Sequence, residues 1–212
     1  MIRNNTYSCS NCQAIYTIKS MNAKLLVCVK CNDVIQDLTN QKLIRKVFPD
    51  DWSYIKIGTK GIANKKQFEV IGRVKLQLFN SYKNAWYILF DDGLTSWLMD
   101  DVGKLSIAQH ATTDIDFDTI YQLVPGKKVK LKNLTCTLYS MEECEQVYYE
   151  GEIGAWAYYS RGFFLAEGVL SNQGTVLFFL NIPKKEIHCM DTASIGFENL
   201  NPSTITQWDE WK

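Results

Sequence analysis

Two Cys-x-x-Cys pairs near the start of the chain constrain its fold more than any other feature of the sequence. Their cysteines are Cys9, Cys12, Cys28 and Cys31. Each pair brings two thiolates to one metal from a tight turn, and two pairs supply the four sulfurs of a closed tetrahedral zinc site. Between the pairs, residues 14–18 and 24–27 are short β-prone runs, so a hairpin can return the second pair to the first. The sequence therefore predicts a zinc ribbon over residues 1–35 that holds one structural Zn²⁺.

Three other uses of these cysteines stay open, namely disulfides, a redox-active Cys-x-x-Cys and an iron–sulfur cluster. Disulfides need an oxidising compartment, and the first ten residues, MIRNNTYSCS, hold no apolar stretch that would direct export. A redox motif is single and lies near a βαβ pattern, which this sequence lacks. Four thiolates leave no open position on zinc for water or a substrate, so we expect a structural metal and not a catalytic one.

The composition is that of an ordinary globular chain, with 212 residues, 46% of them apolar and 22% charged. Apolar runs such as 176–180 are far too short to span a bilayer, so we expect a cytoplasmic protein without a transmembrane segment. The formal net charge is zero, which gives no overall nucleic-acid footprint. Residues 1–50, however, carry seven Lys or Arg and three Asp, formally +4. Nucleic acid would therefore meet the chain at this end, through Lys42, Arg45 and Lys46.

From residue 54 onward the sequence has the pattern of β-structure. Short alternating runs are separated by Gly, Asn and Asp about every eight to twelve positions, and Asp91-Asp92-Gly93 predicts a hairpin turn. The predicted fold class is mainly β, with one or two small antiparallel, SH3-like barrel units behind the ribbon. The sequence leaves open whether this part is one elaborated domain or two. The predicted parts are a zinc ribbon (1–35), a linker (36–53), a first β unit (54–110), a connector (111–125), a second β unit (126–200) and a C-terminal tail (201–212).

One long stretch of the β part carries a family resemblance. It is IGTKGIANKKQFEVIGRVKLQLFNSYKNAWYILFDDGLTSWLMDDVGKLSI, and YEGEIG follows it at 149–154. These motifs resemble the bacterial family catalogued as domain of unknown function 4178, over roughly residues 54–180. The chain departs from that family before Trp86, where Tyr82-Lys83-Asn84-Ala85 replaces a Trp-Asp-Glu-like run. The resemblance implies a bacterial accessory factor of uncharacterised role, often encoded near membrane-stress or polyamine-related genes, with a zinc-ribbon-like N-terminus in some members.

The predicted function is that of a non-enzymatic zinc-binding adaptor or scaffold, because the sequence shows no convergent catalytic set. The partner is expected to be another protein. Its expected surface is the aromatic, Gly-flanked segment AWAYYSRGFF at 155–164, because large apolar side chains in an exposed loop mark partner surfaces. The predicted partner-binding residues are Trp156, Tyr158, Tyr159, Arg161 and Phe163.

Two other functions stay open. One is a nucleic-acid-associated zinc-ribbon protein that uses its positively charged N-terminal end. The other is an enzyme of unknown class whose site is assembled from scattered residues. The residues considered for that site are Glu150, Glu152, Arg161 and His188.

Overall fold

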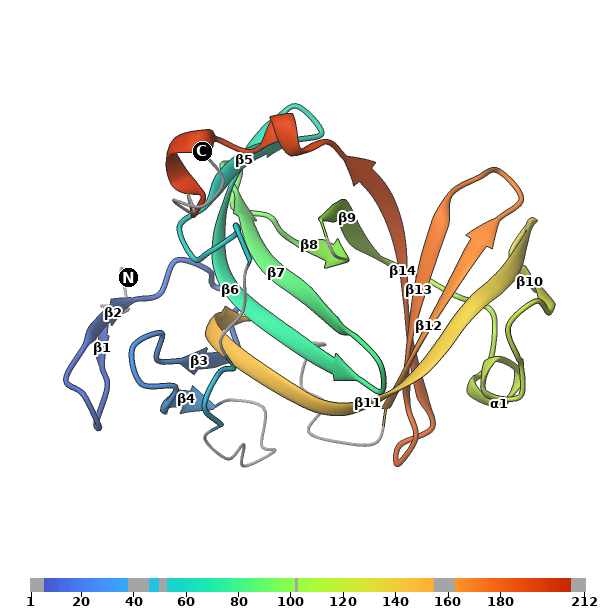
Figure 1. Ribbon diagram of the computed structural model, residues 1–212, viewed down its shortest axis with the longest axis horizontal. Helices are drawn as coiled ribbons and strands as arrows, with labels where there is room; N and C mark the ends of the chain where they lie inside the picture. The colour runs from blue at the N-terminus through green and yellow to red at the C-terminus, as the bar shows by residue number, and fades with distance from the viewer. Residues whose placement is uncertain (1–5, 38–45, 50–52, 102, 155–162, 207–212) are drawn as a thin grey trace.

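Antiparallel strands make up most of the described residues of the computed structural model, as the sequence predicts (Figure 1). The structure describes residues 6–37, 46–49, 53–101, 103–154 and 163–206. Its first nine strands are β1 (Thr6–Ser8), β2 (Ile15–Thr17), β3 (Leu25–Val27), β4 (Val34–Asp37), β5 (Lys60–Ala63), β6 (Lys66–Leu78), β7 (Tyr82–Phe90), β8 (Thr95–Asp101) and β9 (Lys104–Ala111). They are followed by α1 (Phe117–Tyr121), β10 (Lys128–Leu131), β11 (Leu134–Ile153), β12 (Phe163–Leu170), β13 (Thr175–Asn181), β14 (Glu186–Ile195) and the 3-10 turns η1 (Phe197–Asn199) and η2 (Pro202–Thr204). Within these described ranges, no helix has the length and apolar character needed to cross a bilayer.

One large curled sheet contains every described strand except β1 and β2, which pair with each other. The long strand β11 organises this sheet. Its first half pairs with β10 and β12, and its second half pairs with β6 and β3. The ladder from β12 through β13, β14, β9, β8 and β7 to β6 therefore returns to β11 and closes on itself.

Two glycines are required where this sheet turns. Gly93 has a φ of +81° in the β7–β8 turn, and its N–H bonds to the Phe90 carbonyl at 3.0 Å, which confirms the predicted Asp-Asp-Gly hairpin. Gly72 lies at a register shift between β6 and β7, where β6 also meets β11. A Cβ on Gly72 would overlap the carbonyl oxygen of Glu152, so only glycine permits this close approach of two backbones.

The closed ladder gives both faces of its central strands a core to pack against. On β7, Ala85 and Tyr87 belong to an inner cluster that the ladder surrounds, while Trp86 and Ile88 belong to an outer cluster on the opposite face. On β13, Leu177 faces the inner cluster, and its neighbours face a second outer cluster. Strands that are buried on both faces read as continuous apolar runs, which explains the sequences WYILF in β7 and VLFFL in β13.

Each outer cluster is covered by a short segment. Helix α1 places Phe117 and Ile120 over β11–β13, and its N-cap Asp116 accepts a 2.8 Å bond from the Thr119 N–H. The segment after β14 covers the other outer cluster with Leu200, which bridges to Gly61 on β5. The described fold therefore contains three hydrophobic clusters, namely the inner cluster and one covered cluster on each of two outer faces.

Strands from both predicted β units belong to this same sheet. Residues 54–110 contribute β5 to β9, and residues 126–200 contribute β10 to β14. The two sets join at β9–β14 and at β6–β11. Strands β3 and β4 of the predicted ribbon also join it, through β11. The hydrogen-bond ladder thus runs without a break from the ribbon through both β sets.

Candidate metal centre

Each Cys-x-x-Cys pair forms a tight turn with the same backbone hydrogen bonds. In the first turn the Cys9 N–H bonds to the Ala14 carbonyl and the Gln13 N–H bonds to the Cys9 carbonyl, both at 2.9 Å. In the second, Cys28 and Asn32 repeat this pattern at 2.8 and 2.9 Å. The residue after each pair has a positive φ, 60° at Gln13 and 56° at Asn32. Asn tolerates this conformation readily, and Gln13 adopts it even though its residue type favours it less.

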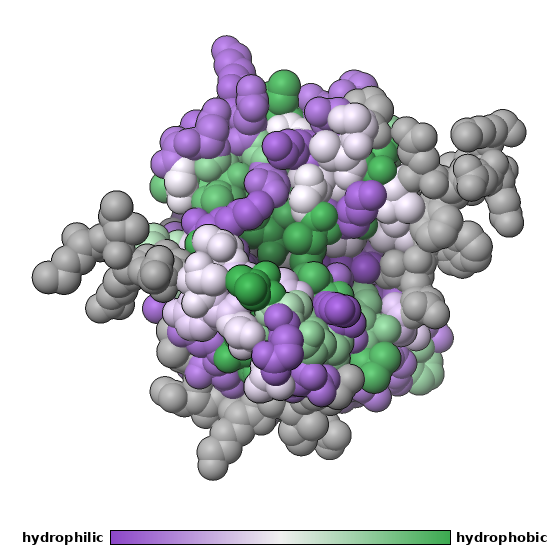
Figure 2. Space-filling view, turned by 90° about the vertical axis from the view of Figure 1, so that its left-hand side faces the viewer, coloured by the Kyte–Doolittle hydropathy of each residue, from purple (hydrophilic) through white to green (hydrophobic). Residues whose placement is uncertain are grey.

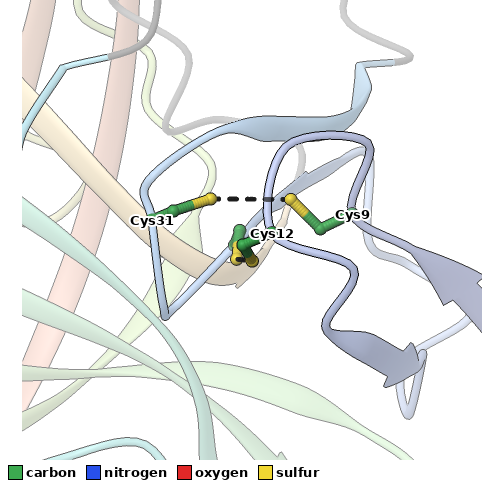
Figure 3. A group of neighbouring side chains, drawn as sticks. Cys9, Cys12 and Cys31 are labelled. Atoms are coloured by element: carbon green, nitrogen blue, oxygen red, sulfur yellow. Dashed lines mark hydrogen bonds between the residues drawn. The ribbon is translucent and has the colours of Figure 1, made fainter.

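The two turns bring all four sulfurs together. Figure 3 shows three of these cysteines, Cys9, Cys12 and Cys31. Cys9 and Cys31 Sγ lie 3.5 Å apart, Cys12 and Cys28 Sγ also lie 3.5 Å apart, and all four lie within 4.8 Å of one another. Sulfurs held about 2.3 Å from one zinc at tetrahedral angles would be about 3.8 Å apart. The four predicted ligands thus fit a single Zn²⁺, and they form the one such cluster found in the described part of the chain.

Hydrogen bonds around Cys28 favour its thiolate form. Burial opposes ionisation of Cys28, but bonds from the Tyr16 hydroxyl, from two backbone amides and from Cys12 outweigh it and lower its pKa to about 6. The Tyr16 hydroxyl lies 3.2 Å from Cys28 Sγ and accepts a 3.1 Å bond from the Val29 N–H. Tyr16 therefore orients one ligand from behind, as outer-shell residues do in zinc sites. The sequence pattern did not single out Tyr16, although its place on the strand between the two pairs was the available signal.

A buried carboxylate fastens the ribbon to the large sheet. Glu152 on β11 is 5% exposed and accepts bonds of 2.8 Å from the backbone N–H groups of Lys19 and Ser20. The Lys24 N–H bonds to the Ile153 carbonyl at 2.9 Å, and β3 continues this pairing along β11. Burial raises the pKa of Glu152, and the two amide bonds partly offset that effect. The ribbon that carries the metal centre is thus hydrogen-bonded directly to strand β11 of the large sheet.

The remaining cysteines have surroundings of a different kind. Cys136, Cys144 and Cys189 are each 1% exposed or less, and burial raises their pKa values to about 11, 12 and 12. Buried thiols with raised pKa values are inert parts of a core. In the ribbon, the 3.5 Å spacing of the nearest sulfurs is far longer than the roughly 2.05 Å of a disulfide bond. The ligand set is therefore the two Cys-x-x-Cys pairs alone.

The predicted partner surface is corrected at one residue. Phe163 begins β12, is 1% exposed and packs in the inner cluster, with its ring centroid 6.3 Å from that of Phe179. Its apolar ring is used by the core, so it is not part of an exposed loop. The other four predicted residues, Trp156, Tyr158, Tyr159 and Arg161, lie outside the described residues.

Of the residues considered for a scattered active site, Glu150 and Glu152 lie on β11 and His188 lies on β14. Glu152 is occupied by the ribbon amides, and Glu150 lies opposite Arg73 on β6. His188 lies on β14 opposite Phe179, and β14 pairs with β13 and β9 and not with β11. Arg161 lies outside the described residues.

A buried ion pair went unnoticed in the sequence. The Lys83 Nζ lies 2.8 Å from Glu167 and 2.9 Å from Asp101, and the side chains of Lys83 and Glu167 are 7% and 10% exposed. Lys83 and Glu167 are 84 positions apart in the chain, so no local pattern joins them.

Comparisons of the chain with protein-family models, with curated proteins and with solved structures give no match. The structure establishes a cluster of four cysteines on a mainly β fold. The resemblance to the domain of unknown function 4178 stays a prediction.

Proposed function

We propose that this protein is a non-enzymatic zinc-binding adaptor whose ribbon is a docking module for another protein. The observation that carries the proposal is apolar exposure on the ribbon. Ile15 is 74% exposed and Met21 is 78% exposed. Both lie between the two Cys-x-x-Cys pairs, on a short segment that one metal holds in place. On the face of the molecule that carries the ribbon, hydrophobic side chains gather among hydrophilic ones (Figure 2).

The geometry of the metal centre supports a structural role for zinc in this adaptor. Four thiolates saturate a tetrahedral ion, so neither substrate nor water has a place on it. A metal of this kind orders a short segment that lacks a core of its own. The ordered segment can then present its apolar side chains with a smaller loss of conformational entropy at the moment of binding.

The wider setting belongs to the same proposal. We place the protein in a bacterial cytoplasm, as an accessory factor of a membrane-stress or polyamine-related system, on the resemblance of roughly residues 54–180 to the domain of unknown function 4178. The predicted barrel-like character of the β part is also kept here. Its support is the ladder that closes through β6 and β11.

Affinity capture with matched variants tests the adaptor role. The zinc-loaded full-length chain is used as bait in a bacterial lysate, with and without nuclease. We expect a stoichiometric protein partner that survives nuclease, is lost with the Ile15→Ser/Met21→Ser double variant, and is retained with Val124→Ser, a control at an apolar residue that is 55% exposed and follows α1. Capture that the double variant leaves intact would contradict the ribbon as the docking module. Capture that disappears with nuclease would instead favour the nucleic-acid alternative.

A further inference from the structure

We infer that one end of the curled sheet is a binding pocket for a small planar aromatic anion, and that the zinc ribbon forms one of its walls. This inference goes beyond the proposed adaptor role, and Ile15 and Met21 do not line the pocket. The cavity has a volume of about 550 Å³, which lies in the range of small-ligand sites. Four parts of the chain supply most of its lining, namely the ribbon, the β5–β6 hairpin, the β7–β8 hairpin and β9.

The floor of the pocket is aromatic and already ordered. The rings of Tyr87 and Trp97 have centroids 4.8 Å apart and are tilted by 39°, and both residues are 3% exposed. The Tyr87 hydroxyl donates to Thr95 Oγ1 at 3.0 Å, which fixes the orientation of its ring. Gly154 lies directly against this ring, where a Cβ would come within 2.6 Å of Tyr87 Cζ. Fixed aromatic side chains in the lining favour a flat aromatic ligand over a saturated one.

The charged residues of the described pocket lining are lysines. Lys24 and Lys66 are among its lining residues, together with His110, and no Asp or Glu is found in the described lining. Lys66 is held by an ion pair of 2.5 Å with Asp92, which lies outside the lining. Lys24 therefore has the main anion-binding role in this proposal. An aromatic ring on the floor and a negatively charged group at the rim together define the ligand class, in which the anion is a carboxylate or a phosphate.

The cavity at the other end of the sheet is smaller and differently lined in the described part of the chain. There the cavity is about 50 Å³, and the cation that lines it, Lys83, already contacts Glu167 and Asp101. Lys104 also lines that end, beside Asp100, so acidic and basic groups are mixed there. Of these two cavities of the described residues, the one at the ribbon end combines aromatic lining residues with lysines and has no Asp or Glu in its described lining.

Zinc and the ligand are coupled in this arrangement because Lys24 belongs to the ribbon. Asn22 and Lys24 both line the pocket, and both lie between the two Cys-x-x-Cys pairs. The Lys24 N–H bonds to the Ile153 carbonyl, and the Ser20 N–H bonds to Glu152, so the sheet holds this wall from the other side. If the metal orders the wall, the ligand must in turn strengthen metal binding by the same factor.

Calorimetric titration of the zinc-loaded full-length chain tests the ligand class. The probes are 2-naphthoate and 2-naphthyl phosphate, with neutral 2-naphthol and the saturated decalin-2-carboxylate as controls. We expect one site, at which an anionic naphthyl probe binds about tenfold tighter than either control, as one charge-assisted hydrogen bond allows. The preferred anion distinguishes a carboxylate ligand from a phosphate ligand. Equal binding of charged and neutral probes, or no binding of either naphthyl anion, would overturn the inference.

A matched pair of variants tests the role of Lys24. Lys24→Gln should remove most of the preference for anions and leave the affinity for 2-naphthol unchanged. Lys60→Gln, on β5 and outside the described lining, should keep the wild-type preference. If both variants behave alike, the anion does not bind at Lys24 and the inference is wrong.

The coupling is tested from the side of the metal. Zinc affinity is measured by competition with a chromophoric chelator, with and without saturating 2-naphthoate. The naphthoate should increase the affinity for zinc, and Lys24→Gln should abolish the increase. An unchanged zinc affinity would show that the ribbon wall and the ligand are independent. Because none of these readouts involves a protein partner, failure of the pocket and failure of the adaptor role are distinguishable.

Discussion

Replacing Glu152 by alanine should loosen the ribbon from the sheet without destroying the metal centre. The carboxylate accepts two bonds of 2.8 Å, from the N–H groups of Lys19 and Ser20. Alanine leaves both donors without an acceptor. The Ser20 N–H is buried and the Lys19 N–H is partly buried, and an unpaired buried donor costs about 1–3 kcal/mol. Burial of the carboxylate works in the opposite direction, since it raises the pKa of Glu152. We therefore expect a net loss of about 3 kcal/mol in the free energy of unfolding.

Urea unfolding of the zinc-loaded full-length chain, followed by circular dichroism, measures this loss. Glu152→Gln keeps the volume and one acceptor oxygen, so it should lose about half as much. Glu143→Ala is the control, because Glu143 lies on the same strand with an exposed side chain, and it should stay within about 0.5 kcal/mol of wild type. All three variants should still bind one zinc, since none changes a ligand. A loss below about 1 kcal/mol for Glu152→Ala would refute the attachment of the ribbon by this carboxylate.

Three further changes test other parts of the structure. Gly72→Ala should lower stability by about 3 kcal/mol in urea unfolding, because its Cβ meets the backbone of β11; a change below about 1 kcal/mol would contradict the close approach. Tyr16→Phe should weaken zinc binding about 10–100-fold in chelator competition, because it removes the hydrogen bond to Cys28 Sγ; unchanged affinity would show that this bond does not tune the site. Burial opposes the charge of Lys83, but its bonds to Glu167 and a second carboxylate raise its pKa above the ordinary value of 10.5. The stabilisation is therefore complete below about pH 10.5 and is lost as pH rises through the folded-state pKa. Lys83→Met should cost about 3–5 kcal/mol at pH 7 and progressively less above about pH 10.5, and a difference that stays constant over that range would be inconsistent with the ion pair.

The metal centre was predictable because its information is local. A Cys-x-x-Cys pair fixes the turn that carries it. The predicted hairpin between the two pairs is wrong, because β2 pairs with β1 whereas β3 pairs with β4 and β11. The positive φ values at Gln13 and Asn32 show that the turn dictates the backbone even where the residue type is only tolerant. The role of Tyr16 depends on which way one side chain leaves a strand, and this was not decided from spacing alone.

The closure of the sheet was not predictable from the same reasoning. Alternation along β6 and the Asp-Asp-Gly turn identify strands and hairpins, but the pairing of β11 with β6 joins residues that are far apart in the chain, such as Gln77 and Gln146. In β7, Trp86 and Tyr87 belong to clusters on opposite faces, so the strand loses the period of two that marks a half-buried strand. The pattern alone therefore fits one domain or two.

Phe163 illustrates a related difficulty. In sequence it stands beside aromatic, glycine-flanked residues and looks like part of a loop. In the structure, the first residue of β12 already faces the inner cluster, beside Phe179 on β13. Burial there depends on a neighbouring strand that composition does not indicate. The pocket at Tyr87 and Trp97 was missed for the same reason, since its floor and rim come from distant parts of the chain.

Native mass spectrometry of the full-length chain with metal analysis tests the central claim most directly. We predict one zinc per chain, lost in Cys28→Ser and retained in Cys136→Ser, a control at a buried cysteine outside the cluster. Iron with inorganic sulfide in place of zinc would contradict the assignment of the metal. One zinc retained in Cys9→Ser/Cys28→Ser would contradict the assignment of the site.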